Sequence, residues 1–319
     1  GTSSILRTWA ASDPRAAADY LTNNVIGSGG DDWMLRRTAG SLASEWAKQD
    51  PQAALVWANT LSDEMKGDAM NNIVEQLTSQ DPLEAAKVAM GFDGEQRERS
   101  LRTIADQWSR NEPEEAVKWA ESLTVEGKTQ ALEEAVESWV GKDTDAAVAY
   151  MAKMDQGERD EIMKEVVEKW GRKGAESQPA AAEWVAAQPD GEGKVDATGE
   201  IVGQWMRTDA ESASGWLNEQ PEGDAKDRGI AALLRDRSVR EDPEAAVAWA
   251  DSISNSEMRS EQVSRSARSW LASDRAGALE YLEQSNSLSA EQKTELINIP
   301  QEELQRGGGD DRSRRGRRF

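Results

Sequence analysis

The chain has 319 residues and a net charge of −22, from 60 acidic and 38 basic side chains, and it contains neither Cys nor His. This composition excludes disulfides, thiolate metal sites and histidine-based acid–base catalysis, and its negative charge opposes binding of nucleic acid or anionic lipid. No apolar run approaches the roughly 20 residues of a transmembrane segment.

Tryptophan dominates the aromatic residues, with 13 Trp against 3 Tyr and 2 Phe. Tryptophans placed by rule indicate a repeat. The clearest copy of the motif consists of Trp46, Asp50, Pro51, Ala54 and Trp57, and nine full or degraded copies follow one another. We call the acidic residue the anchor. The anchors are Asp13, Asp50, Asp81, Glu112, Asp143, Ser177, Asp209, Asp242 and Asp274, spaced 31 to 37 residues apart, with Ser177 as the one non-acidic member.

The residues around each anchor keep fixed positions. An alanine always stands four residues after it, and an aromatic usually stands four before and seven after it, as Trp108 and Trp119 flank Glu112 and Trp139 precedes Asp143. The third copy has Leu77 and Val88 in the two aromatic places, and the eighth has Ser238 in the first. In the sixth copy Trp170 is displaced by an insertion in 171–176, and Trp33 alone lies outside the scheme.

The first residues, with Ile5 and Trp9 four apart, resemble the end of a helix. We therefore expect the natural chain to extend upstream. The missing initial Met fits two explanations, a soluble exported or periplasmic protein whose leader has been removed or a chain that has been shortened, so the compartment stays open.

Each copy predicts a helical hairpin. Asp is a strong N-cap and Pro suits the first helical position, so a helix A of about a dozen residues starts at each anchor, for example over 112–123. Alanine and aromatic lie three residues apart on one face, where a small residue beside a large one lets helices interdigitate. Turn residues follow, then a helix B with apolar pairs four residues apart, as in 131–140. No segment is typical of a strand.

Two different segments follow the last helix A. Residues 290–304 are polar and predict a capping segment. The tail over 305–319 is rich in Gly and Arg, which predicts disorder, and it includes Arg314 and Arg315. Over 307–319 the charge is 5 − 2 = +3, which leaves −22 − 3 = −25 for the rest. Such a tail suits RNA, anionic lipid, an acidic partner or the acidic body itself, or it is inert.

The repeats resemble tetratricopeptide and HEAT arrays over about residues 5–285. The resemblance rests on the helical-hairpin period, the aromatic and small-residue code and the Asp-Pro start of helix A. This chain departs from the tetratricopeptide pattern in one respect. Tetratricopeptide units carry a Leu-Gly pair inside helix A, whereas here Ala120-Glu121-Ser122-Leu123 follows Trp119. The resemblance implies an all-α, right-handed α-solenoid of about nine hairpins over 1–304, with helix A on the concave side and protein binding as its role.

We expect a non-catalytic scaffold that uses no cofactor and binds a protein or peptide of basic character in the helix A groove. The variable polar position six after the anchor, with nearby acids, supplies the candidate binding residues, and Trp33 and the tail arginines join them. Trp46, Trp57, Trp108, Trp119 and Trp139 are expected to fill seams between hairpins. The candidates are Trp33, Glu84, Lys87, Glu115, Lys118, Glu183, Arg314 and Arg315.

Two alternatives from other classes stay open. Paired carboxylates also hydrolyse glycosides in helical toroids, so a glycan-active enzyme or sugar-binding protein is one. A self-assembling array of the cell envelope, with the tail making the contacts, is the other. No P-loop, dinucleotide fingerprint or serine elbow is present, and the acids around 190–196 fail the EF-hand spacing, so no metal site is predicted. The sequence leaves the oligomeric state open.

Overall fold

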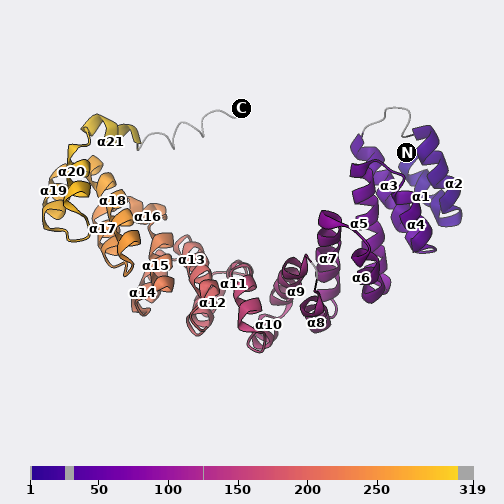
Figure 1. Ribbon diagram of the computed structural model, residues 1–319, viewed down its shortest axis with the longest axis horizontal. Helices are drawn as coiled ribbons and strands as arrows, with labels where there is room; N and C mark the ends of the chain where they lie inside the picture. The colour runs from indigo at the N-terminus through magenta and orange to yellow at the C-terminus, as the bar shows by residue number, and fades with distance from the viewer. Residues whose placement is uncertain (1, 26–31, 125, 308–319) are drawn as a thin grey trace. The chain divides into compact units, whose positions relative to one another are not determined.

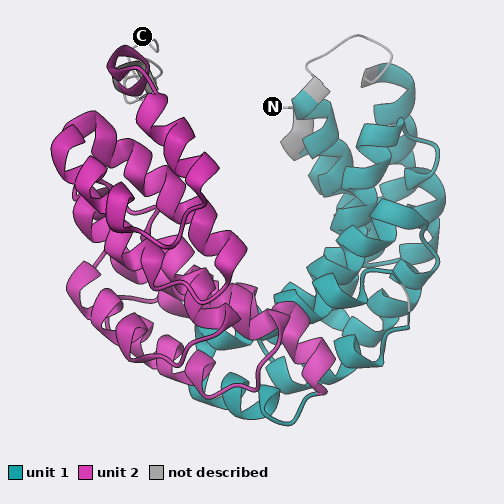
Figure 2. Cartoon of the chain, turned by 60° about the vertical axis from the view of Figure 1, so that its left-hand side comes forward, with its two compact units in different colours: residues 1–154 teal, residues 155–319 magenta. Residues whose placement is uncertain are grey.

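The computed structural model describes residues 2–25, 32–124 and 126–307, and all regular structure within them is helical (Figure 1). The expected all-α class is thereby confirmed. The chain divides into two compact units, unit 1 over residues 1–154 and unit 2 over residues 155–319 (Figure 2). Among the described residues, no helix combines the length and the apolar character needed to cross a lipid bilayer.

Long and short helices alternate along the chain. The short A helices each follow an anchor or, in the sixth copy, begin at it: α2 (Pro14–Tyr20), α4 (Pro51–Ala58), α6 (Pro82–Met90), α8 (Pro113–Ser122), α10 (Thr144–Met151), α12 (Ser177–Ala186), α14 (Ala210–Glu219), α17 (Pro243–Asp251) and α19 (Arg275–Gln284). The B helices are α1 (Thr2–Ser12), α3 (Asp32–Ala47), α5 (Asp63–Gln80), α7 (Gly94–Ser109), α9 (Lys128–Lys142), α11 (Gln156–Gly171), α13 (Glu192–Met206), α15 (Asp224–Leu233) and α18 (Ser256–Ser273). The remaining elements are η1 (Leu21–Val25), α16 (Arg237–Arg240), α20 (Ala290–Asn298) and α21 (Gln301–Gly307).

The anchor ends one helix and starts the next. At Asp143, the backbone N–H donates to the carbonyl of Trp139 over 2.7 Å and so completes the last turn of α9. Its side chain accepts from the N–H of Ala146 over 3.0 Å, and its carbonyl accepts from the N–H of Ala147 over 3.1 Å, which begins α10. An i to i−4 bond fixes the spacing of four between Trp and anchor. Side-chain caps of this kind form at Asp13, Asp50, Asp81, Asp143, Asp209, Asp242 and Asp274.

Two anchors do not cap a helix with their side chains. Glu112 precedes α8, but its carboxylate accepts from the indole N–H of Trp108 over 3.0 Å instead. Ser177 is itself the first residue of α12, and Glu176 occupies the cap position without a side-chain bond. The three inserted residues between Trp170 and Ser177 explain the second case, because they move the anchor out of reach of the last turn of α11.

Removing one anchor side chain tests this junction. We expect Asp50→Ala to lower the free energy of unfolding by about 1 kcal/mol, because the N–H of Ala53 loses its acceptor at 2.9 Å. Asp50→Asn keeps a capping oxygen and should differ little from the native chain. Urea unfolding followed by circular dichroism measures both, and equal losses for the two variants would contradict a capping role.

Aromatic pairs join the helices on either side of the anchor. The described residues contain seven aromatic contacts, with ring centroids 5.4 to 6.2 Å apart, and each joins the Trp before an anchor to the aromatic seven residues after it. In six of them this Trp stands four residues before the anchor, and in the sixth copy the insertion places Trp170 seven residues before Ser177. The alanine four residues after each anchor is buried in every copy, where it leaves room for the neighbouring helix. The pairs are Trp9–Tyr20, Trp46–Trp57, Trp108–Trp119, Trp139–Tyr150, Trp170–Trp184, Trp205–Trp216 and Trp270–Tyr281.

Within each unit the B helices pack more closely than the A helices. In unit 1, α3 packs along α5 and α7 along α9, and in unit 2, α13 packs along both α11 and α15. Consecutive A helices make few such approaches, and most A helices pack instead on the B helices before and after them, as α8 packs on α7 and α9.

The aromatic seven residues after the anchor explains this spacing. In four copies its side chain donates to a residue of the earlier A helix or, for Trp57, of η1, which directly follows α2. The indole N–H of Trp57 donates to Thr22 Oγ1 over 3.2 Å, and the hydroxyl of Tyr150 donates to Glu121 Oε2 over 2.8 Å. Burial, with the carboxylate of Glu121, raises the pKa of Tyr150, so this phenol keeps its proton. A ring between two A helices holds them apart.

The copy with Ser238 has a broken B helix. Helix α15 ends at Leu233, and the short α16 starts after Asp236, whose side chain accepts from the N–H of Ser238. Before this break, Asp227 of α15 is 1% exposed. Its carboxylate accepts from the N–H and hydroxyl of Ser254 over 2.8 and 2.7 Å, and from the N–H of Asn255 over 2.8 Å. It thereby fixes the loop between α17 and α18.

The segment predicted as a cap forms two helices. Leu296 of α20 and Leu304 of α21 are buried, and both helices pack on α18. The side chain of Gln301 donates to the carbonyl of Ala272, and Arg268 pairs with Glu303 over 3.2 Å. Helix α21 therefore runs antiparallel to α18, from its end towards its beginning.

Candidate functional site

Trp33, the one tryptophan outside the motif, lies on the surface. It is the second residue of α3, and 56% of it is exposed. Met34 beside it is also exposed. None of the other candidate residues is on this helix. Trp33 is thus an exposed aromatic on a different helix from the polar residues predicted to bind.

The four polar candidates of unit 1 form two small ion-pair sets on successive A helices. Lys87 lies 3.1 Å from Glu84 on α6. On α8, Lys118 lies 2.8 Å from Glu114 and 3.1 Å from Glu115. All of these side chains are exposed, so each pair contributes little to stability and is free to exchange partners.

The other candidates have different positions. Glu183 on α12 accepts a hydrogen bond from the indole N–H of Trp216 over 3.0 Å, which gives it a contact within the fold rather than an open binding position. Arg314 and Arg315 lie outside the described residues. Trp46, Trp57, Trp108 and Trp139 are buried, and Trp119 is half-buried in its pair with Trp108.

A hollow of about 550 Å³ opens between the A helices α4 and α6 of unit 1, and we call it the α4–α6 hollow. Leu55 and Val56 of α4 face Val88 and Lys87 of α6 across it. Residues from α5, the start of α7 and the loop before it close the remaining sides, and they include Lys66, Met70, Phe92, Asp93 and Gln96.

The hollow lies where the repeat lacks an aromatic. Val88 occupies the place seven residues after its anchor, where most copies carry Trp or Tyr, and Leu77 occupies the place four before. A valine is too short to span the gap that a ring fills elsewhere. The missing aromatic at position 88 can therefore be seen in the sequence. The motif alone did not identify Val56 or Val88 as site residues.

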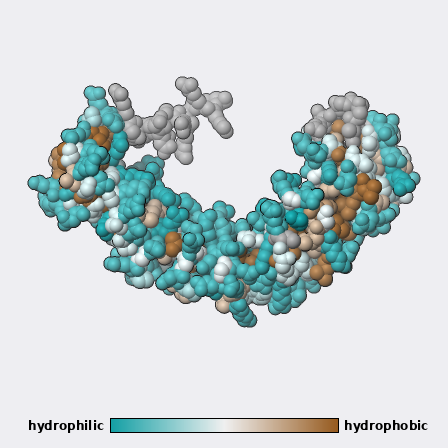
Figure 3. All heavy atoms as spheres, viewed as in Figure 1, coloured by the Kyte–Doolittle hydropathy of each residue, from teal (hydrophilic) through white to brown (hydrophobic). Residues whose placement is uncertain are grey.

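Exposed apolar side chains surround this part of unit 1. Val56 is 70% exposed, and Leu83 and Met90 of α6 are also exposed. In Figure 3, hydrophobic residues gather over the helices of unit 1. Water-exposed apolar groups next to a hollow are typical of an interaction surface.

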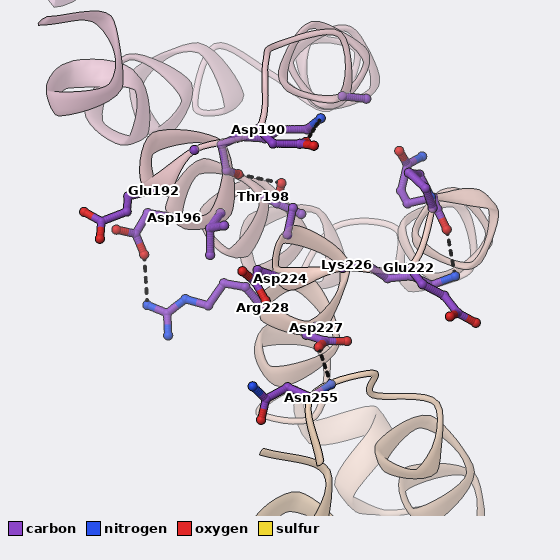
Figure 4. Close-up of a pocket in the computed structure, with 18 of the residues that line it drawn as sticks. Asp190, Glu192, Asp196, Thr198, Glu222, Asp224, Lys226, Asp227, Arg228 and Asn255 are labelled. Carbon is purple, nitrogen blue, oxygen red and sulfur yellow. Dashed lines mark hydrogen bonds and ion pairs between the residues drawn. The ribbon is translucent and has the colours of Figure 1, made fainter. Parts of the chain in front are cut away.

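A second and larger hollow lies in unit 2 (Figure 4). Its volume is about 1050 Å³, and the starts of α13, α15 and α18 with the loops before them line it. We call it the acidic groove, because six carboxylates line it against three basic side chains. The acids are Asp190, Glu192, Asp196, Glu222, Asp224 and Asp227, and the bases are Lys194, Lys226 and Arg228.

The two lysines of the groove already bond to groups of the chain itself. Lys194 donates to the carbonyl of Gln188 over 2.9 Å, and it lies 3.1 Å from Asp190. Lys226 donates to the carbonyls of Asn218 and Gln220, each over 2.8 Å. These bonds satisfy the end of each preceding A helix, where carbonyls lack partners.

The acids are used less completely. Arg228 lies 3.4 Å from Asp196, and Asp227 is held by the loop before α18. Glu192, Glu222 and Asp224 are exposed, and no partner for their carboxylates is present in the described part of the chain. The groove therefore presents negative charge.

No group of three or more acidic side chains in the described residues is arranged to hold a metal ion. Neither a family model, nor a curated protein, nor a solved structure matches the chain.

Proposed function

We propose that the chain is a non-catalytic protein-binding scaffold. In this proposal it is a right-handed α-solenoid of about nine hairpins, of the kind that tetratricopeptide and HEAT arrays form, and a protein or peptide inserts an apolar side chain into the α4–α6 hollow. The observation that carries the proposal is the hollow at Val88, with Val56 exposed on its rim. Buried apolar anchors in pockets supply most of the affinity of such interfaces.

The surroundings of the hollow favour a particular partner. Apart from residues 307–319, the chain carries a charge of −22 − 3 = −25, so basic residues beside the apolar anchor would be attracted over the rest of the surface. At the hollow itself, Lys66 and Lys87 stand at the wall, and Lys87 is held by Glu84. A peptide with one bulky apolar residue and basic residues farther along fits both features.

A peptide library tests the proposal directly. Phage-displayed random peptides would be selected on the full chain, and the enriched peptides synthesised and titrated by fluorescence anisotropy. We expect enrichment of a bulky apolar residue. We also expect Val56→Asp to weaken binding at least about tenfold, or ~1.4 kcal/mol, because a carboxylate at the rim would have to lose its water.

The repeat itself offers matched controls. Ala149 has the same position in α10 as Val56 has in α4 and is also exposed, so Ala149→Asp adds the same charge elsewhere in unit 1 and should leave affinity unchanged. Val88→Trp places in the hollow the ring that other copies carry and should abolish binding while the circular dichroism spectrum is kept. Peptides that bind this variant as well as the native chain would overturn the proposal.

A further inference from the structure

The acidic groove of unit 2 is a separate surface from the α4–α6 hollow, and it calls for a cationic ligand. With six acids and three bases its formal charge is 3 − 6 = −3. Three helices start at its wall, and helix starts carry partial positive charge. The first turns contain Glu192, Asp224 and Glu257, whose carboxylates offset those partial charges.

The groove also offers contacts besides charge. Trp216 contributes an indole at its wall, and Pro221 and Met258 add apolar surface. The carboxylates of Glu192, Glu222 and Asp224 belong to two successive loop-and-helix starts (Figure 4). Arginine suits such a place, because its planar fork binds carboxylates with two parallel hydrogen bonds.

The chain holds a cationic segment of matching charge. Residues 308–319 contain five Arg and two Asp, a charge of 5 − 2 = +3. They follow α21 directly, and α21 runs along α18 towards the end of α18 that lines the groove with Met258.

The chain after Glu303 is long enough to reach the acidic groove. Arg268, which pairs with Glu303, is 13 residues after Asn255, and at 1.5 Å per helical residue this is about 20 Å along α18. Helix α21 covers part of this path with the four residues after Glu303. The 12 residues of 308–319 span at most about 40 Å when extended. They can reach the groove of the same chain.

We propose that residues 308–319 bind in the acidic groove of their own chain through their arginines. The tether makes this binding favourable even when each contact is weak, because it sets an effective concentration on the order of millimolar. The groove is then closed to other basic segments until one competes with the tail. This inference stands on unit 2 alone and does not depend on the hollow of unit 1.

A spin label locates the tail. The chain has no Cys, so Ser313→Cys introduces a single attachment site for a nitroxide in the full-length protein. We expect loss of the amide NMR signals of residues 191–198 and 222–228, with signals of α10 unaffected. When the spin-labelled chain is mixed with an excess of native chain that carries neither spin label nor isotope, the signal loss must remain. If dilution abolishes it, the tail binds a second copy and the proposal fails.

Charge variants test the contact itself. Glu192→Gln, Glu222→Gln and Asp224→Asn together should restore the lost signals, since they remove three free carboxylates from the groove. The control removes three exposed acids of other helices of unit 2, Glu211, Glu280 and Glu283, and should restore nothing. Signal loss that survives the groove variant would place the tail elsewhere and overturn the inference.

Competition provides a second readout. A synthetic peptide of residues 308–319 should bind the full chain at least about tenfold more weakly than it binds a full-length variant with all five tail arginines changed to serine, because the native tail already occupies the groove. Equal affinities for the two proteins would also overturn the inference. The circular dichroism spectrum of the serine variant checks that its fold is kept.

Discussion

Replacing Trp205 with alanine is expected to lower the free energy of unfolding by about 3–5 kcal/mol. Trp205 is 5% exposed and meets Trp216 with ring centroids 6.2 Å apart. Loss of the indole removes a large apolar surface and leaves a cavity between α13 and α14. Urea unfolding followed by tryptophan fluorescence and by circular dichroism measures the change.

Trp33→Ala is the matched control for that prediction. It makes the same substitution at a tryptophan that is 56% exposed, so little packing is lost and the change should stay within about 0.5 kcal/mol. A double-mutant cycle with Trp216→Ala should give a coupling of about 0.5–1.5 kcal/mol for the ring pair. A Trp205→Ala chain as stable as Trp33→Ala would contradict the seam role of the motif tryptophans.

Asp227→Asn is expected to lower the free energy of unfolding by about 2–3 kcal/mol, because it disturbs a buried hydrogen-bonded carboxylate. The native carboxylate is 1% exposed and accepts three hydrogen bonds from Ser254 and Asn255. An asparagine of the same shape must turn an NH₂ group towards at least one of these donors. The loop before α18 would then lose its hold, and amide hydrogen exchange at Ser254 and Asn255 should become faster.

Asp224→Asn provides the comparison, because Asp224 is in the same helix but exposed. Its stability should change by no more than about 0.5 kcal/mol. If both variants unfold at the same urea concentration as the native chain, the three hydrogen bonds of Asp227 contribute nothing net. Unchanged exchange at Ser254 and Asn255 in Asp227→Asn would lead to the same conclusion.

The repeat motif predicted the framework because each of its residues acts locally. Asp50 caps the helix that it precedes, and Pro51 occupies the first helical position, as capping chemistry requires. Ala54 and Trp57 are buried on one face of α4. Such effects depend only on neighbours a few residues away, so the pattern of one copy determines them.

The two hollows and the contacts of the candidate residues depend on distances that the motif does not contain. Glu183 occupies the same position in its copy as Lys87, yet Trp216, 33 residues later, uses its carboxylate. The absence of an aromatic at Val88 was visible, but only the packing of α4 against α6 turns that absence into a hollow. The acidic groove likewise joins three loops that are about one repeat apart in sequence.

The double role of the anchor also limits where this chain can change length. An extra residue between Trp139 and Asp143 would separate the end of α9 from the start of α10, and so damage two helices at once. The insertion before Ser177 shows the consequence, since α12 begins there without a side-chain cap. New length is therefore tolerated best in the turns that lead from an A helix to a B helix. A loop inserted in one of those turns should therefore leave the helices on both sides of it intact.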